Sequence, residues 1–71
     1  MTIGQRINEI RIERNMTMRQ LAKSSGVSYD TINSWVYRGY HPDIELLIMV
    51  ADVFGVTLDE LVGRKFEKVT E

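Results

Sequence analysis

Polar side chains recur at helical spacing in the segment that begins at Tyr29. An aspartate, an asparagine, a serine and a tyrosine fall on one face of a helix there, at about 100° per residue. These residues are Asp30, Asn33, Ser34 and Tyr37. Ile32 and Trp35 fall on the opposite face. Carboxylate, carboxamide and hydroxyl groups donate and accept hydrogen bonds at the edges of base pairs. The spacing therefore predicts a helix that buries one side and offers hydrogen-bonding groups on the other.

Each of these polar residues also has a purely structural interpretation. Asp30 can accept from cytosine N4 or merely interact with the positive end of its own helix, and both interpretations stay open. For Asn33 we favour base contact, because asparagine is a poor helix former unless its side chain makes a stabilising interaction with a partner. The hydroxyls of Tyr29, Tyr37 and Tyr40 would suit sugar-phosphate contacts, but the rings would equally suit half-buried packing.

Start and stop signals predict five short helices. Capping-box spacing precedes three of them, and asparagine or glycine follows most of them. The expected ranges are 3–14, 18–25, 29–37, 44–54 and 58–62. No segment alternates apolar and polar residues long enough to predict a strand. The sequence thus indicates an all-α domain over residues 1–63, with a short C-terminal tail at 64–71.

The second and third predicted helices have the residue types of a helix-turn-helix, over about residues 18–37. A small residue, Ala22, allows the two helices to cross closely, and Gly26 can take the positive φ that the tight turn needs. Val27 is expected to fill the core beneath the turn. Six positions hold the type that this geometry requires: Leu21, Ala22, Gly26, Val27, Ile32 and Trp35.

Charge is divided along the chain, although the formal net charge is only −1. Residues 1–41 carry six basic and three acidic side chains, a net charge of +3. Residues 42–71 carry three basic and seven acidic side chains, a net charge of −4. If the N-terminal part forms one face, that face would attract phosphates. A mixed, solvated surface is the alternative.

At these positions the chain resembles the Cro and phage-repressor (XRE-type) helix-turn-helix family. The matching residues are Leu21-Ala22, Gly26-Val27-Ser28, Thr31-Ile32, Gly39, Pro42, Leu47, Ala51, Gly55-Val56 and Leu58-Asp59-Glu60-Leu61. The resemblance implies a compact five-helix, lambda-repressor-like DNA-binding domain. It implies base contacts from Tyr29, Asp30, Asn33 and Ser34. It also implies contacts to the DNA backbone from Met18, Arg19, Lys23, Ser28, Thr31, Tyr37, Arg38 and Tyr40.

Two departures from the family pattern bear on the site. Members often have glutamine where this chain has Met18, so this chain lacks the side chain that in those members can contact DNA and support the third helix. Many members also pair the arginine at the position of Arg11 with a buried glutamate, whereas Val36 stands there in this chain. We therefore expect the Arg11 guanidinium to bind backbone carbonyls or solvent.

The fourth predicted helix is apolar on two sides. One stripe is expected to face the core: Ile44, Leu47, Ile48, Ala51 and Phe54. A second, nearly opposite stripe holds Leu46, Met49 and Val53, and a surface helix should not be apolar on both sides. The tail, through Phe66 and Val69, or a second subunit would have to cover it. The sequence favours a homodimer with an interface of Leu46, Met49, Val53 and Phe66, because the family's operators are usually two-fold.

Other functional classes find little support in the sequence. The chain has no cysteine and a single histidine, His41, so we expect no metal site and no cofactor. Motifs of phosphate-binding or nucleophilic catalysis are absent, and 71 residues leave little room for a deep substrate pocket, so neither an enzyme nor a small-molecule ligand is expected. No apolar run is long enough to cross a membrane, and we expect a cytoplasmic protein. The function predicted is that of a transcriptional regulator specific for a double-stranded DNA sequence, acting as a repressor that binds a palindromic operator as a dimer. The alternative is a protein-interaction module, such as an antitoxin-like adaptor.

Overall fold

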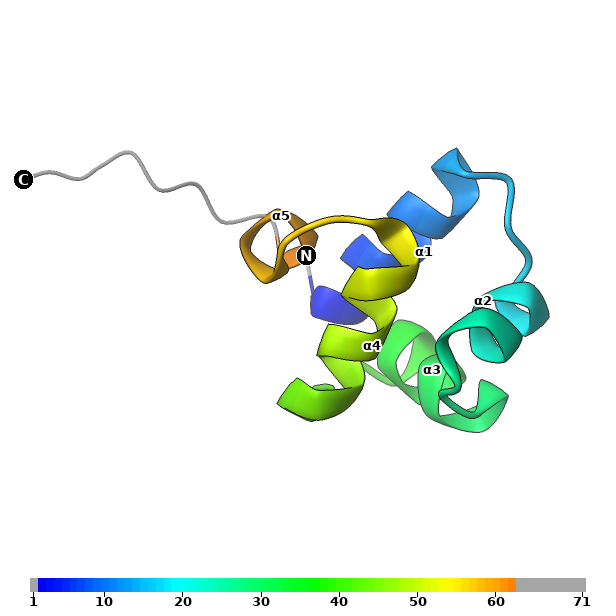
Figure 1. Ribbon diagram of the computed structural model, residues 1–71. Helices are drawn as coiled ribbons and strands as arrows, with labels where there is room; N and C mark the ends of the chain where they lie inside the picture. The colour runs from blue at the N-terminus through cyan, green and yellow to red at the C-terminus, as the bar shows by residue number, and fades with distance from the viewer. Residues whose placement is uncertain (1, 63–71) are drawn as a thin grey trace, which may run out of the picture.

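The computed structural model describes residues 2–62, which form five α-helices (Figure 1). They are α1 (Ile3–Glu13), α2 (Met18–Ser25), α3 (Tyr29–Tyr37), α4 (Ile44–Phe54) and α5 (Leu58–Val62). Within the described residues there is no strand, so the predicted all-α class is confirmed. The predicted tail at 64–71 and its Phe66 lie outside the described residues.

Local hydrogen bonds set the start of most helices, as the sequence predicts. At α2 the Thr17 hydroxyl accepts from the backbone N–H of Gln20 at 3.0 Å, and the Gln20 side chain accepts from the N–H of Thr17 at 2.7 Å. The same reciprocal pair opens α1 and α5. Asp43 stands at the cap position of α4 but makes no capping hydrogen bond with its side chain.

Left-handed residues end the first two helical segments. Asn15 has a φ of 58°, and the chain then reverses into α2. Gly26 has a φ of 80° and ends α2, which gives the tight turn into α3. Both residues were predicted for these places, because asparagine and glycine tolerate this conformation best.

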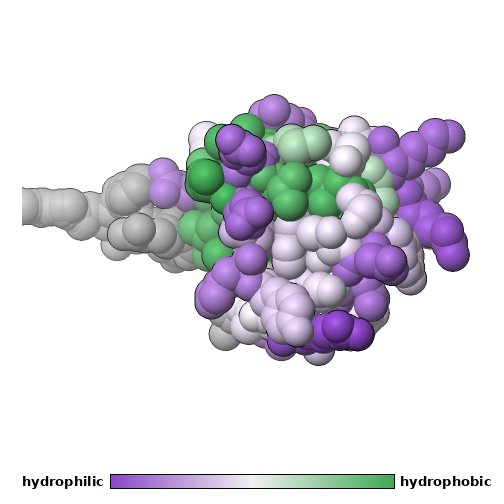
Figure 2. Space-filling view, turned by 90° about the horizontal axis from the view of Figure 1, so that it is seen from below, coloured by the Kyte–Doolittle hydropathy of each residue, from purple (hydrophilic) through white to green (hydrophobic). Residues whose placement is uncertain are grey.

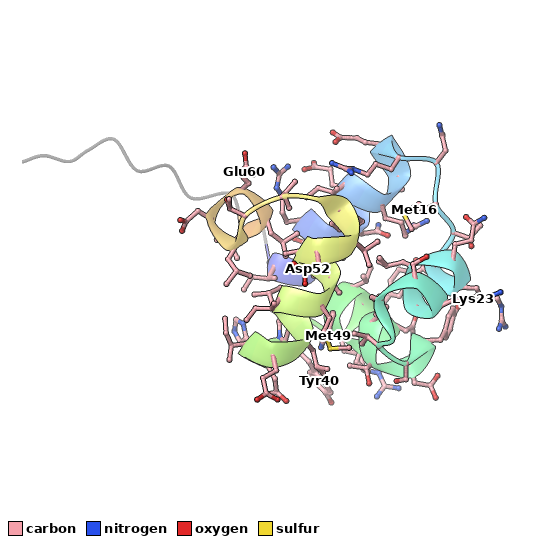
Figure 3. All side chains as sticks on the ribbon, in the orientation of Figure 1. Met16, Lys23, Tyr40, Met49, Asp52 and Glu60 are labelled. Atoms are coloured by element: carbon pink, nitrogen blue, oxygen red, sulfur yellow. The ribbon has the colours of Figure 1, made fainter. Side chains whose placement is uncertain are left out.

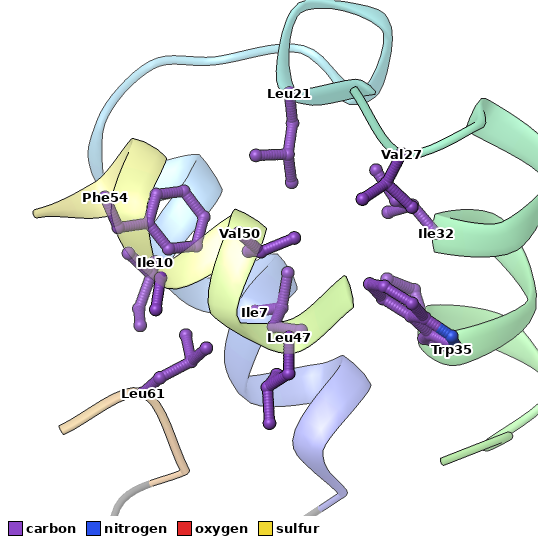
Figure 4. Packing of buried hydrophobic residues seen from close by; sticks show 12 residues of the cluster. Ile7, Ile10, Leu21, Val27, Ile32, Trp35, Leu47, Val50, Phe54 and Leu61 are labelled. Carbon is purple, nitrogen blue, oxygen red and sulfur yellow. The ribbon is translucent and has the colours of Figure 1, made fainter. Parts of the chain in front are cut away.

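A single hydrophobic core joins all five helices (Figure 4). Its buried members are Ile7, Ile10, Leu21, Val27, Ile32, Trp35, Val36, Leu47, Val50, Ala51, Phe54 and Leu61. Helix α1 packs against α3 and α5, while α2 packs against α3 and α4. In Figure 1, α2 and α3 lie together on one side of the molecule, and α5 lies on the other. This packing fixes the orientation of the α2–α3 unit relative to the rest of the domain.

The buried side of α4 differs from the prediction. Ile44 and Ile48 were expected in the core, but 58% and 44% of their surface is exposed. Val50 is fully buried in their place, beside Leu47 and Ala51. The helix is apolar around most of its circumference, so its sequence pattern is compatible with more than one rotation of α4 about its own axis. Contacts with α2 and α5 select the one that is observed.

Arg11 finds acceptors without a carboxylate. Its Nη1 donates to the backbone carbonyl of Met16 at 2.6 Å, and its Nη2 and Nε donate to Oδ1 of Asn8 at 2.6 and 3.1 Å. The predicted use of a backbone carbonyl is confirmed, whereas the contribution of Asn8 was not foreseen. The network ties the end of α1 to the loop that leads into α2.

Within residues 2–62, no helix is long and apolar enough to cross a bilayer. The same part of the chain holds no group of three or more histidine, cysteine, aspartate or glutamate residues arranged to bind a metal ion.

Candidate nucleic-acid interface

The turn between α2 and α3 is held by hydrogen bonds within the chain. The N–H of Gly26 donates to the carbonyl of Ala22 at 2.9 Å, and Val27 is buried beneath the turn. Ser25 is also buried, and its hydroxyl accepts from the N–H of Val27 at 3.2 Å. This role of Ser25 was not predicted from the sequence, although a serine directly before the turn glycine is the pattern that indicates it. These bonds fix the orientation of α3 relative to α2.

The first turn of α3 is closed by two hydroxyl groups. The Ser28 hydroxyl accepts from the N–H of Thr31 at 3.1 Å and donates to the Thr31 hydroxyl at 2.7 Å. Ser28 is exposed and Thr31 is half-buried. Both hydroxyls keep acceptor capacity toward solvent.

The outward face of α3 carries the four side chains predicted for base contact. Tyr29 is 39% exposed and Asp30 is exposed, whereas Asn33 and Ser34 are half-buried. The Ser34 hydroxyl donates to the carbonyl of Asp30 at 3.0 Å, so its remaining capacity toward a ligand is that of an acceptor. Ile32 and Trp35 face the core, as predicted. The structure thus brings the four polar residues together along one solvent-facing side.

Basic side chains flank this face. Arg19, Lys23 and Arg38 are exposed, and none of them forms a salt bridge with another residue in the described range. Figure 3 shows Lys23 at the periphery of the molecule on α2. The guanidinium of Arg19 lies 5.0 Å from the ring centroid of Tyr29. These three cations therefore keep their hydrogen-bonding capacity for an external anion.

Other arginines serve the fold instead. Arg6 forms a salt bridge with Glu9 at 2.9 Å and donates to the carbonyl of Glu60 at 3.3 Å. The guanidinium of Arg14 lies over the ring of Phe54, 5.5 Å from its centroid. The positive charge of residues 1–41 is therefore divided between internal contacts and the α2–α3 surface.

The tyrosines near the end of α3 point to solvent. Tyr37 and Tyr40 are 69% and 59% exposed, so they are not the half-buried packing residues that the sequence also allowed. Figure 3 shows Tyr40 at the edge of the molecule. The N–H groups of Arg38 and Tyr40 both donate to the carbonyl of Ser34, which folds the loop back over the end of the helix. Met18, in contrast, is half-buried against the core. Its backbone N–H, in the first turn of α2, remains the part of Met18 best placed to meet a phosphate.

Two of the residues predicted for a dimer interface are partly covered by the domain itself. Leu46 and Val53 pack partly against the domain's own core. Met49 is 36% exposed, and its Cε lies 3.3 Å from where a Cβ on Gly26 would stand. The exposed apolar side chains of α4 are Ile44, Ile48 and Met49. Figure 2, which views the molecule from below, shows hydrophobic side chains gathered in one area with hydrophilic ones around it.

Comparison with known proteins identifies this arrangement. A family model described as helix-turn-helix matches residues 7–61, which is most of the chain. The chain belongs to this helix-turn-helix family. The match includes the whole α2–turn–α3 unit and extends to α5, which agrees with the resemblance to the Cro and phage-repressor type.

This helix-turn-helix chain is similar to proteins that regulate transcription. The HTH-type transcriptional regulator AnsR of Bacillus subtilis is 34% identical over 65 residues, covering 92% of this chain and 56% of the relative. The immunity repressor protein of Bacillus phage phi105 is 35% identical over 65 residues, covering 92% of this chain and 45% of the relative. The chain thus spans about half the length of these curated relatives.

A solved structure supports the same fold. The P22 c2 repressor, in complex with the synthetic operator 9T, superposes with a TM-score of 0.79 and 25% sequence identity, covering 92% of this chain and 98% of that one. The lambda-repressor-like arrangement predicted for this helix-turn-helix protein is confirmed. The family and these relatives also agree with a regulator rather than an enzyme.

Proposed function

We propose that this protein is a transcriptional repressor that recognises a specific sequence of double-stranded DNA by placing α3 in the major groove. The observation that carries the proposal is the solvent-facing polar side of α3, with Arg19, Lys23 and Arg38 around it. An α-helix fits the major groove of B-DNA, and exposed cations beside it supply phosphate contacts. The relatives that are repressors or transcriptional regulators support the same function.

The side chains divide into two functional groups in this proposal. Tyr29, Asp30, Asn33 and Ser34 contact base edges. The DNA backbone is contacted by Met18, Arg19, Lys23, Ser28, Thr31, Tyr37, Arg38 and Tyr40. The capping box of α2 occupies the N–H groups of Thr17 and Gln20, so those of Met18 and Arg19, which have no partner within the helix, can donate to a phosphate.

The test begins with selection of bound duplexes from a random pool at physiological salt. Asn33→Ala and Arg38→Ala are then measured on the selected duplex and on a scrambled one across a salt series. Asn33→Ala should weaken specific binding by about 1–3 kcal/mol per half-site and relax the preference at one base pair. Arg38→Ala should weaken binding to both duplexes alike and reduce the salt slope by about one unit.

The same measurements separate the proposal from its alternative. If the two variants respond identically, or if neither differs from the wild type, α3 is not the recognition element. A protein-interaction module, such as an antitoxin-like adaptor, would then be the better description. Its hydrophobic interface would be nearly indifferent to salt, whereas DNA binding falls steeply as salt rises.

We also propose that the protein binds a palindromic operator as a homodimer. A two-fold operator requires two copies of α3, and one self-complementary patch is enough to form such a dimer. In this proposal the patch consists of the exposed apolar residues Ile44, Ile48 and Met49, so Ile44 and Ile48 replace the partly buried Leu46 and Val53 in the predicted interface. Phe66, the fourth predicted interface residue, lies outside the described residues.

The remaining predictions about organisation belong to the same proposal. Residues 1–63 would form the DNA-binding domain and residues 64–71 a short extension. A double-stranded DNA partner agrees with the cytoplasmic location expected from the sequence.

A further inference from the structure

Arg19 and Tyr29 connect the two helices of the proposed DNA interface through a cation–π contact. The guanidinium carbon of Arg19 lies 5.0 Å from the ring centroid of Tyr29. Arg19 is the second residue of α2, and Tyr29 is the first residue of α3. Both residues are exposed. A planar guanidinium can cover an aromatic face and still donate at its edges to a phosphate.

The contact restricts both side chains before any ligand arrives. An unrestrained arginine or tyrosine loses rotamer freedom when it is ordered at an interface, which weakens binding. In this protein the cation–π contact already brings the two side chains together, which reduces that loss. Met18, where the family often has a glutamine that supports α3, is half-buried against the core. Arg19, one residue further along α2, is the side chain that reaches α3 instead.

The exposed part of the Tyr29 ring has a specific chemical counterpart in DNA. One face of the ring is covered by the cation, and the remaining ring carbons are apolar. In the major groove the 5-methyl group of thymine is the apolar group of the base pairs, and aromatic side chains can contact it. Tyr29 opens α3, next to the cap residue Ser28, where helix-turn-helix proteins present side chains to base edges.

We propose that Arg19 is a positioning residue that holds the ring of Tyr29 against the 5-methyl group of a thymine, so that Tyr29 determines specificity at that base pair. This inference rests on the proposed DNA-binding function. It assigns one specificity contact to the ring rather than to the hydroxyl of Tyr29. It also couples that contact to a phosphate contact made by Arg19.

The experiment replaces each thymine of the selected duplex, one position at a time, with deoxyuridine, which lacks only the methyl group. The wild-type protein should lose about fourfold in affinity at one position per half-site, the value expected for one buried methyl group. For each variant we then measure the thymine-to-uracil ratio, which is the affinity for the thymine duplex divided by the affinity for the duplex with deoxyuridine at that position. Tyr29→Phe should keep this ratio, and Tyr29→Ala should bring it close to one.

Arg19→Ala and Lys23→Ala form the matched pair, because each removes one exposed cation from α2. Both should flatten the salt dependence by about one unit. Only Arg19→Ala should also lower the thymine-to-uracil ratio, since Lys23 is not stacked on the ring. Circular dichroism and thermal melting of each variant verify that it is folded.

Three results would overturn the inference while leaving DNA binding established. The first is a wild-type protein whose affinity changes at no thymine position. The second is an unchanged thymine-to-uracil ratio in Arg19→Ala. The third is a thymine-to-uracil ratio close to one in Tyr29→Phe. The last result would assign the contact to the hydroxyl. Failure of the wild type to bind any duplex in a salt-dependent manner would be a different outcome, because it would overturn the proposed function itself.

Discussion

Gly4 lies directly against the backbone of Trp35, so that the first turn of α1 and the last turn of α3 meet without a side chain between them. A Cβ built on Gly4 would overlap the carbonyl group of Trp35 and would stand 2.9 Å from the backbone nitrogen of Val36. Backbone atoms of a helix cannot move aside as the end of a flexible side chain can. The position of α3, and with it the proposed recognition surface, therefore depends on the absence of a side chain at Gly4.

Gly4→Ala should destabilise the protein by about 1–3 kcal/mol, the usual effect of overpacking. The sign of the change in the free energy of unfolding is informative, because a glycine-to-alanine substitution within a helix ordinarily stabilises a protein by about 0.5–1 kcal/mol. Urea denaturation measures the change. Glu13→Ala, at an exposed position of the same helix, is the control and should stay within about 0.5 kcal/mol. A stabilised Gly4→Ala protein would show that α1 and α3 do not approach so closely.

Arg11→Met should cost less than about 2 kcal/mol, because no buried ion pair is broken. The substitution removes the hydrogen bonds to Asn8 and to the Met16 carbonyl but keeps much of the aliphatic packing. Thermal and urea unfolding give the difference. A loss of about 4 kcal/mol or more, as expected for a broken buried pair, would contradict this account of Arg11.

Ser28→Ala should lower stability by about 1 kcal/mol, because it removes the hydroxyl that accepts from the N–H of Thr31 at the start of α3. Binding of the selected duplex should weaken in parallel, since α3 carries the proposed base contacts. Ser24→Ala, at an exposed position of α2, is the control and should leave both quantities almost unchanged. Equal effects of the two substitutions would argue against the capping role.

Ile48→Glu should shift a dimer to a monomer in sedimentation velocity, because it places a charge in the exposed apolar patch of α4. Met49→Glu should do the same, but its side chain also lies beside Gly26, so Ile48 gives the cleaner test. Ile12→Glu is the matched control, since Ile12 is an exposed isoleucine on α1, 56% exposed against 44% for Ile48. If the Ile48 variant remains dimeric, or the wild type is monomeric at high concentration, this interface is wrong.

The sequence alone predicted most helix boundaries, because the interactions that set them are local. The capping pair of Thr17 and Gln20 spans three residues, and the left-handed conformations of Asn15 and Gly26 depend on the residue itself. The buried side of α3 was also predictable, since Ile32 and Trp35 are apolar while the other side is polar. For the same reason, the family pattern could be identified without coordinates.

Only the tertiary structure decided the features that depend on residues distant in sequence. The helix α4 is apolar on several sides, so its own pattern could not choose between burying Ile48 and burying Val50. The need for Gly4 appears only once the backbone of α3 lies against α1. Arg19 and Tyr29 stack because the α2–α3 turn brings together side chains ten positions apart. Local rules specify where each helix begins and ends, but the rotation of a helix and the partners of its side chains follow from how the helices fill one shared core.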